Sequence, residues 1–291
     1  MLMWEPVLWG QLLINGVMLA GLYGLLALGL NLVFGVMRVI NFAHGELVML
    51  GAFVTFWGYT AFGLHPLLAL PLSALALFAL GWVLQRLLLE RVLGGPPMAG
   101  LLVTFGLSLV VINAGLLVFG ADIRSIPVVT GSLLLGGFVF PRARGLAFLV
   151  AVALTALTVA FLKWSALGRA IRATAQHPEV AITCGVDVRR TRLVTFGLGA
   201  ALGSAAGSLL MVILPMDPQS GSFLILKAFA VIIIGGLGSV AGGLLGALVL
   251  GVAEVFGAFF FSTVFGEVVA YVLLLLVLLV RPAGLLGVAE R

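Results

Sequence analysis

Long apolar stretches, separated by short polar segments, dominate this chain and constrain what it can fold into. Of its 291 residues, 63% are hydrophobic and only 9% are charged, whereas charged residues make up about 25% of a soluble domain. A helix of about 20 apolar residues crosses the hydrocarbon core of a bilayer. The sequence therefore predicts an all-α, polytopic transmembrane helix bundle, with about 8–10 spans in a single domain over residues 1–291.

Nine apolar runs are predicted to form helices in or across the membrane. They are Leu12–Val36, Glu46–Phe62, Pro66–Leu84, Met98–Phe119, Gly145–Leu162, Leu193–Leu214, Phe223–Leu237, Val240–Phe261 and Thr263–Val280. The seventh run is short, carries Lys227 and ends in the glycine-rich segment Gly235–Gly238. It is typical of a half-helix or a re-entrant segment.

The basic residues predict the orientation, because Lys and Arg are retained in cytoplasmic loops. If the segment Lys163–Arg192 is cytoplasmic, eleven basic residues fall inside and three fall outside. The inside set is Arg38, Arg86, Arg91, Lys163, Arg169, Arg172, Arg189, Arg190, Arg192, Arg281 and Arg291. The bias predicts an external N-terminus and a cytoplasmic C-terminus. Arg124, Arg142 and Arg144 are the outside set, and we expect the last two on a short external helix.

Several kinds of chemistry are not expected. The single cysteine, Cys184, excludes an internal disulfide and a cysteine-cluster metal site. The run Gly235–Ser239 lacks the lysine of an ATP-binding P-loop, so a partner must supply any energy from ATP. The net charge of +5 sits in membrane loops and does not indicate nucleic-acid binding. We expect no cofactor, no metal and no enzymatic activity.

Polar residues cluster between the first two apolar runs, where burial in lipid is costly. They are Asn31, Arg38, Asn41, His44 and Glu46. One interpretation assigns Asn31, Asn41, His44 and Glu46 to the translocation path. In the alternative, His44 and Glu46 cap helix ends and Arg38 pairs with Glu46.

Three charged residues lie in the C-terminal apolar runs: Lys227, Glu254 and Glu267. Lys227 is expected to pair with a glutamate across the bundle, as a structural ion pair or, together with Glu254, as part of the path. Buried carboxylates could instead serve as relays in a transporter driven by an ion gradient.

Two segments resemble each other at nine of fifteen positions, Gly21–Gly35 and Gly243–Gly257. The predicted topology runs them in opposite directions across the bilayer. They indicate either an inverted repeat, as in many transporters, or shared Gly/Leu low complexity.

The segment Lys163–Arg192 predicts two short helices. Ser165 can cap one that runs through Arg169 and Arg172. Pro178 suits the first turn of the second, Glu179 the positive end of its dipole, and Gly185 its left-handed end. With the small Ala181 on its surface, this second helix suits the groove of a partner protein. Alternatively, the segment is an amphipathic loop anchored to lipid headgroups by its arginines.

The run Glu179-Val-Ala-Ile-Thr-Cys-Gly185 resembles the EAAxxxG coupling motif of ABC importer permeases, with Val180 replacing an alanine. In that family this element docks the ATPase subunits. The resemblance implies an ATPase-coupling loop that contains Gly168, Arg169, Arg172, Glu179, Ala181 and Gly185.

A more specific resemblance covers nearly the whole chain. The runs Gly29–Gly35, Asn41–Glu46 and Met49–Ala52 are similar to the N-terminal motif of branched-chain amino acid ABC permeases. Three later runs also match that family in order: Gly168–Ala173, Ala230–Ser239 and Arg281–Gly287. The pattern is most similar to the LivH-like of its two paralogous subunits.

This resemblance implies a multi-pass permease of the bacterial cytoplasmic membrane that works by alternating access. Its partners would be a second, LivM-like permease, two cytoplasmic ATP-binding subunits, an extracytoplasmic solute-binding protein and membrane lipid. The solute would be a branched-chain or related hydrophobic amino acid, or alternatively urea or a short-chain amide. Two other classes stay open: a secondary transporter that uses Glu254 and Glu267, and an integral membrane enzyme, which three scattered histidines hardly support.

Overall fold

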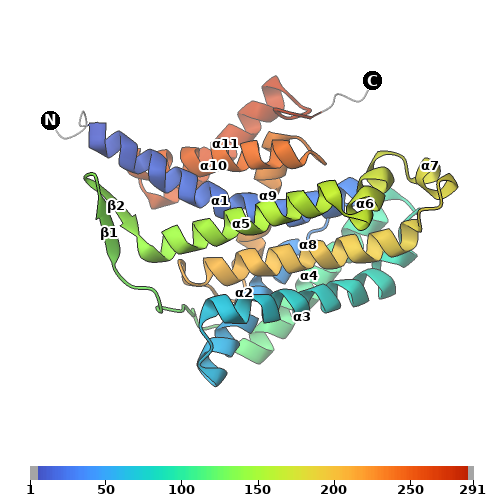
Figure 1. The fold of residues 1–291 in the computed structure, drawn as a ribbon, viewed down its shortest axis with the longest axis horizontal. Coiled ribbons are helices and arrows are strands. Elements are labelled where there is room, and N and C mark those ends of the chain that lie inside the picture. The colour runs from blue at the N-terminus through green and yellow to red at the C-terminus, as the bar shows by residue number, and fades with distance from the viewer. Residues whose placement is uncertain (1–5, 288–291) are drawn as a thin grey trace.

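The described part of the chain, residues 6–287 of a computed structural model, consists of eleven α-helices, one 3-10 helix and one β-hairpin (Figure 1). In chain order these are α1 (Pro6–Met37), α2 (His44–Phe62), α3 (Pro66–Leu87), η2 (Leu89–Arg91), α4 (Pro97–Phe119), β1 (Ser132–Leu135), β2 (Phe138–Pro141), α5 (Arg142–Trp164), α6 (Ala166–Gln176), α7 (Pro178–Thr183), α8 (Val188–Leu210), α9 (Ser220–Gly235), α10 (Val240–Phe260) and α11 (Thr263–Val280).

Seven of these helices are long and apolar enough to cross a membrane: α1, α2, α3, α4, α5, α8 and α10. Two more apolar helices, α9 and residues Phe265–Val280 of α11, are shorter. The prediction of a polytopic helical bundle is confirmed, and each predicted run corresponds to one observed helix. Helix α9 has the reduced length expected of a half-helix.

Helices α1 and α8 form the centre of the bundle, and glycines allow their close packing. Gly199, Gly203 and Gly207 recur every four residues along α8. A Cβ atom on Gly199 would collide with Val33 of α1, and one on Gly207 would collide with the carbonyl of Val48 in α2. Between helices in lipid the hydrophobic driving force is absent, and close packing stabilises the pair instead. Small residues at such crossings allow that close packing.

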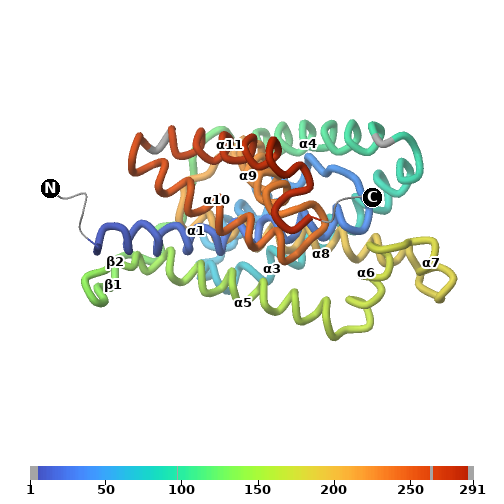
Figure 2. The backbone as a smooth tube through the Cα atoms, turned by 90° about the horizontal axis from the view of Figure 1, so that it is seen from above, coloured from blue at the N-terminus to red at the C-terminus, as the bar shows by residue number. Residues whose placement is uncertain are grey.

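Helices α1 and α10 lie side by side and run in opposite directions (Figure 2). Gly16 lies against Val252, whereas Gly24, further along α1, lies against Ala247. The two similar segments, Gly21–Gly35 and Gly243–Gly257, are therefore antiparallel neighbours. Their origin as an inverted repeat stays a prediction.

The hairpin β1–β2 was not expected from the sequence. Its strands pair from Ser132 with Pro141 to Leu135 with Phe138. Gly136 and Gly137 form the two-residue turn, with φ of 59° and 85°, the conformation that tight hairpins demand. Arg142 and Arg144 follow directly in the first turn of α5, so the expected separate external helix is wrong.

Six of the eleven predicted inside residues lie around α6 and α7, at the end of α5, in α6 and at the start of α8: Lys163, Arg169, Arg172, Arg189, Arg190 and Arg192. Arg291 lies outside the described residues. Arg124, Arg142 and Arg144 lie toward the opposite side, where Figure 1 shows the hairpin and the N-terminal end of α1. The separation agrees with the predicted charge bias. Which side faces the cytoplasm stays a prediction.

Candidate functional site

Two short helices, α6 and α7, project at one end of the bundle (Figure 1). We call residues 166–185, which contain both, the docking segment. The Ser165 hydroxyl accepts a hydrogen bond from the Gly168 N–H at 2.8 Å and caps α6. Pro178 opens α7, and Gly185, with φ of 80°, follows its end. The structure therefore confirms the predicted caps of both helices.

The outer surface of α7 differs from the prediction in one respect. Ala181 is only 3% exposed, so its expected place on the surface is wrong. In this six-residue helix Ala181 faces the bundle, and Val180 and Ile182 on either side are 58% and 59% exposed. Ala181 therefore brings α7 close to the bundle, and Glu179, Val180 and Ile182 are available to a partner.

The other docking-segment residues tie α6 to the end of α5. A Cβ atom on the buried Gly168 would collide with the carbonyl groups of Phe161 and Leu162. Arg172 donates a hydrogen bond to the Leu162 carbonyl, and Arg169 donates one to the Trp164 carbonyl at 3.2 Å. These contacts hold the docking segment in a fixed position on α5.

Residues 38–46, which we call the polar elbow, carry the chain from α1 back into the bundle. Arg38 follows the last residue of α1 in the left-handed conformation, with φ of 52°. The chain then turns back, and His44 Nε2 lies 3.2 Å from the carbonyl oxygen of Leu26. Leu26 lies eleven residues before Met37, where α1 ends, which corresponds to about 16 Å of helix. Helix α2 therefore begins beside the middle of α1.

Glu46 is fully buried in the first turn of α2. Its Oε1 accepts hydrogen bonds from Ser108 of α4 at 3.2 Å and Ser222 of α9 at 3.4 Å. Among the described residues no ion pair joins Glu46 to Arg38, so the alternative with that pair is wrong.

Asn41 and His44 have different surroundings from Glu46. The Asn41 side-chain oxygen accepts the Ala43 N–H at 3.1 Å, so Asn41 orders the turn that precedes α2. His44 packs between Gly29 of α1 and Gly203 of α8. The elbow therefore points His44 into the core and Glu46 toward α4 and α9.

Helix α9 also begins at the level of Glu46. A Cβ atom on Gly45 of α2 would collide with the Gly221 carbonyl of α9, so the first turns of the two helices touch. The Asp217 carboxylate accepts hydrogen bonds from the Gln219 N–H at 3.0 Å and the Ser220 hydroxyl at 2.8 Å, which orders the start of α9. Two helix N-termini thus meet beside Glu46, deep in the bundle.

Asn31 holds the turn between α9 and α10. Its amide donates to the Ser239 carbonyl and accepts from the Gly238 N–H, both at 2.7 Å. Asn31 also borders a cavity of about 240 Å³, together with Lys163 and Arg172 at the base of the docking segment. Asn31 therefore connects the turn between α9 and α10 with the cavity at the base of the docking segment.

A separate charged cluster lies between α1, α9, α10 and α11. Lys227 Nζ contacts Glu254 at 2.8 Å and Glu267 at 3.3 Å. It also donates to the Tyr23 hydroxyl at 3.0 Å, which in turn donates to Glu254 at 2.9 Å. The expected pairing of Lys227 with a glutamate is confirmed. Tyr23 was missed, because one tyrosine in an apolar run gives no sign of a distant partner.

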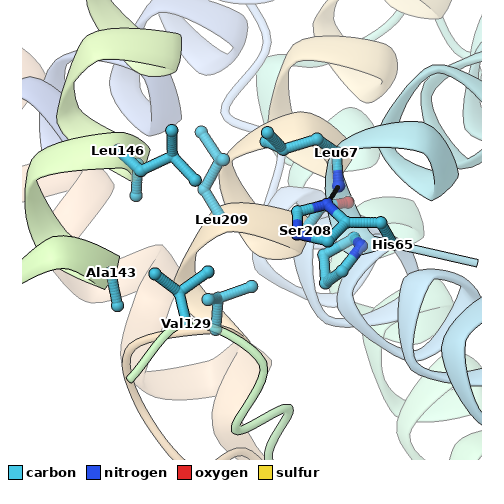
Figure 3. A pocket seen from close by; sticks show the side chains of 10 residues that line it. His65, Leu67, Val129, Ala143, Leu146, Ser208 and Leu209 are labelled. Atoms are coloured by element: carbon cyan, nitrogen blue, oxygen red, sulfur yellow. Dashed lines mark hydrogen bonds between the residues drawn. The ribbon is translucent and has the colours of Figure 1, made fainter. Parts of the chain in front are cut away.

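Figure 3 shows another cavity, lined by His65 and Leu67 of the α3 start, Leu146 of α5 and Leu209 of α8. Its volume is about 10 Å³, room for about one water molecule. His65 here accepts the Leu67 N–H at 3.3 Å and caps α3. This cavity is too small to hold an amino acid.

Comparison with known proteins identifies the family. The model of the branched-chain amino acid transport system permease component matches residues 12–278. The permease protein BraD of the high-affinity branched-chain amino acid transport system of Pseudomonas aeruginosa is 35% identical, and the alignment covers 96% of each chain. The corresponding LivH proteins of Salmonella typhimurium and Escherichia coli are each 33% identical over 96% of both chains. No solved structure matches. The chain belongs to the permease component family of branched-chain amino acid transport systems.

Proposed function

We propose that this chain is one of two permease subunits of an ATP-driven importer that moves branched-chain amino acids across the cytoplasmic membrane by alternating access. The observation that carries this proposal is the docking segment. It is anchored to α5 by Gly168 and Arg172 and exposes Val180 and Ile182 at one end of an apolar bundle. Such a rigid projection suits contact with an ATP-binding subunit whose movement displaces it.

The proposed assembly includes a second, LivM-like permease, two cytoplasmic ATP-binding subunits and an extracytoplasmic solute-binding protein. The family membership supports this set, because the relatives are named as permease proteins of transport systems. ATP hydrolysis takes place on the partner subunits, and this chain supplies the path and the contact that couples them.

The docking segment can pass a displacement to the centre of the bundle. Helix α6 contacts α1, α5 and α8. Asn31 of α1 is in turn hydrogen-bonded to the α9–α10 turn. A shift of α6 can therefore displace α1 and, through Asn31, the turn between α9 and α10. This displacement can drive transport only if the ATP-bound partners bind the two states of the alternating-access cycle with different affinity.

The test is uptake of radiolabelled leucine into proteoliposomes that contain the complete transporter and leucine-loaded binding protein. We expect uptake that requires ATP, is abolished when the ATP-binding subunits cannot hydrolyse ATP, and is competed by isoleucine and valine but not by urea or acetamide. Leucine uptake by this chain without ATP-binding subunits would contradict the proposal.

A further inference from the structure

Unpaired polar atoms are concentrated in the polar elbow. Seven buried side-chain nitrogen or oxygen atoms lack a hydrogen-bond partner among the described residues, and three of them belong to Asn41, His44 and Glu46. All three residues are at most 1% exposed. Buried polar groups are nearly always paired, and each exception requires an explanation. A ligand that is not yet in place is one such explanation.

The unpaired atoms of Glu46 and Asn41 have opposite hydrogen-bonding character. Glu46 Oε2 is a carboxylate oxygen that can accept a bond from a cation, whereas Asn41 Nδ2 can only donate. Glu46 lies where α2 meets the start of α9, and helix N-termini favour negative charge. A zwitterion, with one ammonium and one carboxylate group, matches this combination of donors and acceptors.

Three phenylalanines border the same junction. The ring of Phe42 lies 6.2 Å from Phe105 of α4 and 5.4 Å from Phe229 of α9, measured between ring centres. Phe105 precedes Ser108 by about one helical turn, and Phe229 follows Ser222 by about two turns, or about 10 Å. The same two helices that hold Glu46 therefore present an apolar surface next to it.

Helix α4 is the loosely held wall of this junction. Its side chains are largely exposed, with Leu102 at 61%, Val110 at 65% and Leu117 at 88%. It meets the elbow through Thr104, which accepts the Phe42 N–H at 3.3 Å, and through Ser108. A movement of α4 would open Glu46 and the three rings without disturbing the α1–α8 core.

We propose that the junction of α2, α4 and α9 is the solute site of the translocation path. There Glu46 receives the α-ammonium group of the amino acid, Asn41 and the two helix N-termini face its carboxylate, and Phe42, Phe105 and Phe229 receive its branched side chain. This inference rests on the proposed function and names the chemistry of its path. In this structure Ser108 and Ser222 hold Oε1 of Glu46, whereas Oε2 packs against Gly221 of α9 and has no hydrogen-bond partner, so the ligand enters by displacing α9 or α4 from it.

The first experiment compares Glu46→Gln with Asp122→Asn in the complete transporter. Both changes remove one negative charge, but Asp122 is 79% exposed in a surface pair with Arg124, away from the junction. We expect leucine uptake to fall at least about tenfold in Glu46→Gln, because a charge-assisted hydrogen bond is lost. Asp122→Asn should transport normally. Equal leucine uptake by the two variants would overturn the assignment, while ATP-dependent uptake by the unaltered transporter would leave the proposed function intact.

The second experiment uses the unaltered protein and does not depend on the folding of a variant. Dicyclohexylcarbodiimide modifies carboxyl groups within membrane proteins, and mass spectrometry quantifies the modification of Glu46. Leucine and 3-methylbutylamine, which retain the ammonium group, should protect Glu46. The matched acid, 4-methylpentanoate, lacks that group and should not protect it. Protection by the acid but not by the amine, or by neither leucine nor the amine, would overturn the assignment.

Discussion

Single glycine residues allow the closest contacts between helices in this molecule. At Gly168 the helix axis of α6 approaches the last turn of α5 so closely that a methyl group would meet two backbone carbonyls. At Gly145, also a helical glycine, only the terminal carbon of Met18 lies within reach, at 4.0 Å. The same substitution should therefore have different effects at the two sites.

We expect Gly168→Ala to lower the free energy of unfolding by about 1–3 kcal/mol, because overpacking forces α6 away from α5. The displaced docking segment should also reduce ATP-dependent uptake. Gly145→Ala is the control: it should leave uptake unchanged and should not lower the free energy of unfolding, because alanine is the better helix former and meets no close neighbour there. Thermal unfolding in detergent and leucine uptake measure the two effects, and equal behaviour of the variants would contradict the role of Gly168.

Lys227 is the one cation in contact with both Glu254 and Glu267 among the described residues. We expect Lys227→Met to destabilise the subunit by about 3–5 kcal/mol, because it leaves a buried carboxylate without its counter-charge. The double variant Lys227→Met/Glu254→Gln removes that unpaired charge and should recover part of the loss. Denaturant unfolding in detergent would test this, and a double variant less stable than the single one would contradict it.

At the scale of elements, α7 exposes two large apolar side chains although it lies outside the spans. Val180 and Ile182 are each more than half exposed. We expect Val180→Ser/Ile182→Ser to leave the subunit folded, since neither side chain is buried, and to weaken the binding of the ATP-binding subunits at least about tenfold.

The matched control is Leu134→Ser in β1, which is 75% exposed at the opposite side of the molecule. Copurification of the ATP-binding subunits measures the effect. Full retention of these subunits by the α7 double variant would show that they bind elsewhere.

The elements that could be predicted from the sequence are those whose sequence signals lie within one short stretch of the chain. A run of about 20 apolar residues predicts a membrane helix without knowledge of its tertiary contacts, so the observed helices match the predicted runs. The caps at Ser165 and Gly185 are equally local. The hairpin was missed because its strands, such as Ser132–Leu135, are only four residues long and pair with nothing else in the described chain.

The candidate site was predicted in part for the same reason. Glu46 is conspicuous in an apolar chain, and so is Lys227. Ser108 stands within an apolar run and Ser222 just before one, neither with a local pattern that indicates a partner, and only the fold places them beside Glu46. Ala181 was misplaced because the buried side of a six-residue helix depends on how that helix docks.

At the scale of the whole molecule, the docking segment and the hairpin mark opposite ends (Figure 1). The single cysteine, Cys184, is exposed at the docking end. We expect a membrane-impermeant maleimide to label Cys184 in inside-out vesicles of cells that contain this chain without its ATP-binding partners, and not in intact cells.

The control places a cysteine in the hairpin by combining Ser132→Cys with Cys184→Ser. Ser132 is exposed, and the charge bias puts it outside, so labelling in intact cells is expected. The reverse pattern for the two positions would invert the orientation of the bundle.

The depth at which α2 begins also has a consequence for biosynthesis. The carboxylate of Glu46 enters the bilayer with the second helix, but its hydroxyl partners lie at positions 108 and 222, much later in the chain. Until those segments are synthesised, the nascent subunit has to shelter an acidic group in the translocon, in water or as the neutral acid. Helices α1 and α2 therefore cannot reach their final structure as an isolated pair, because the ribosome must first pass Ser222.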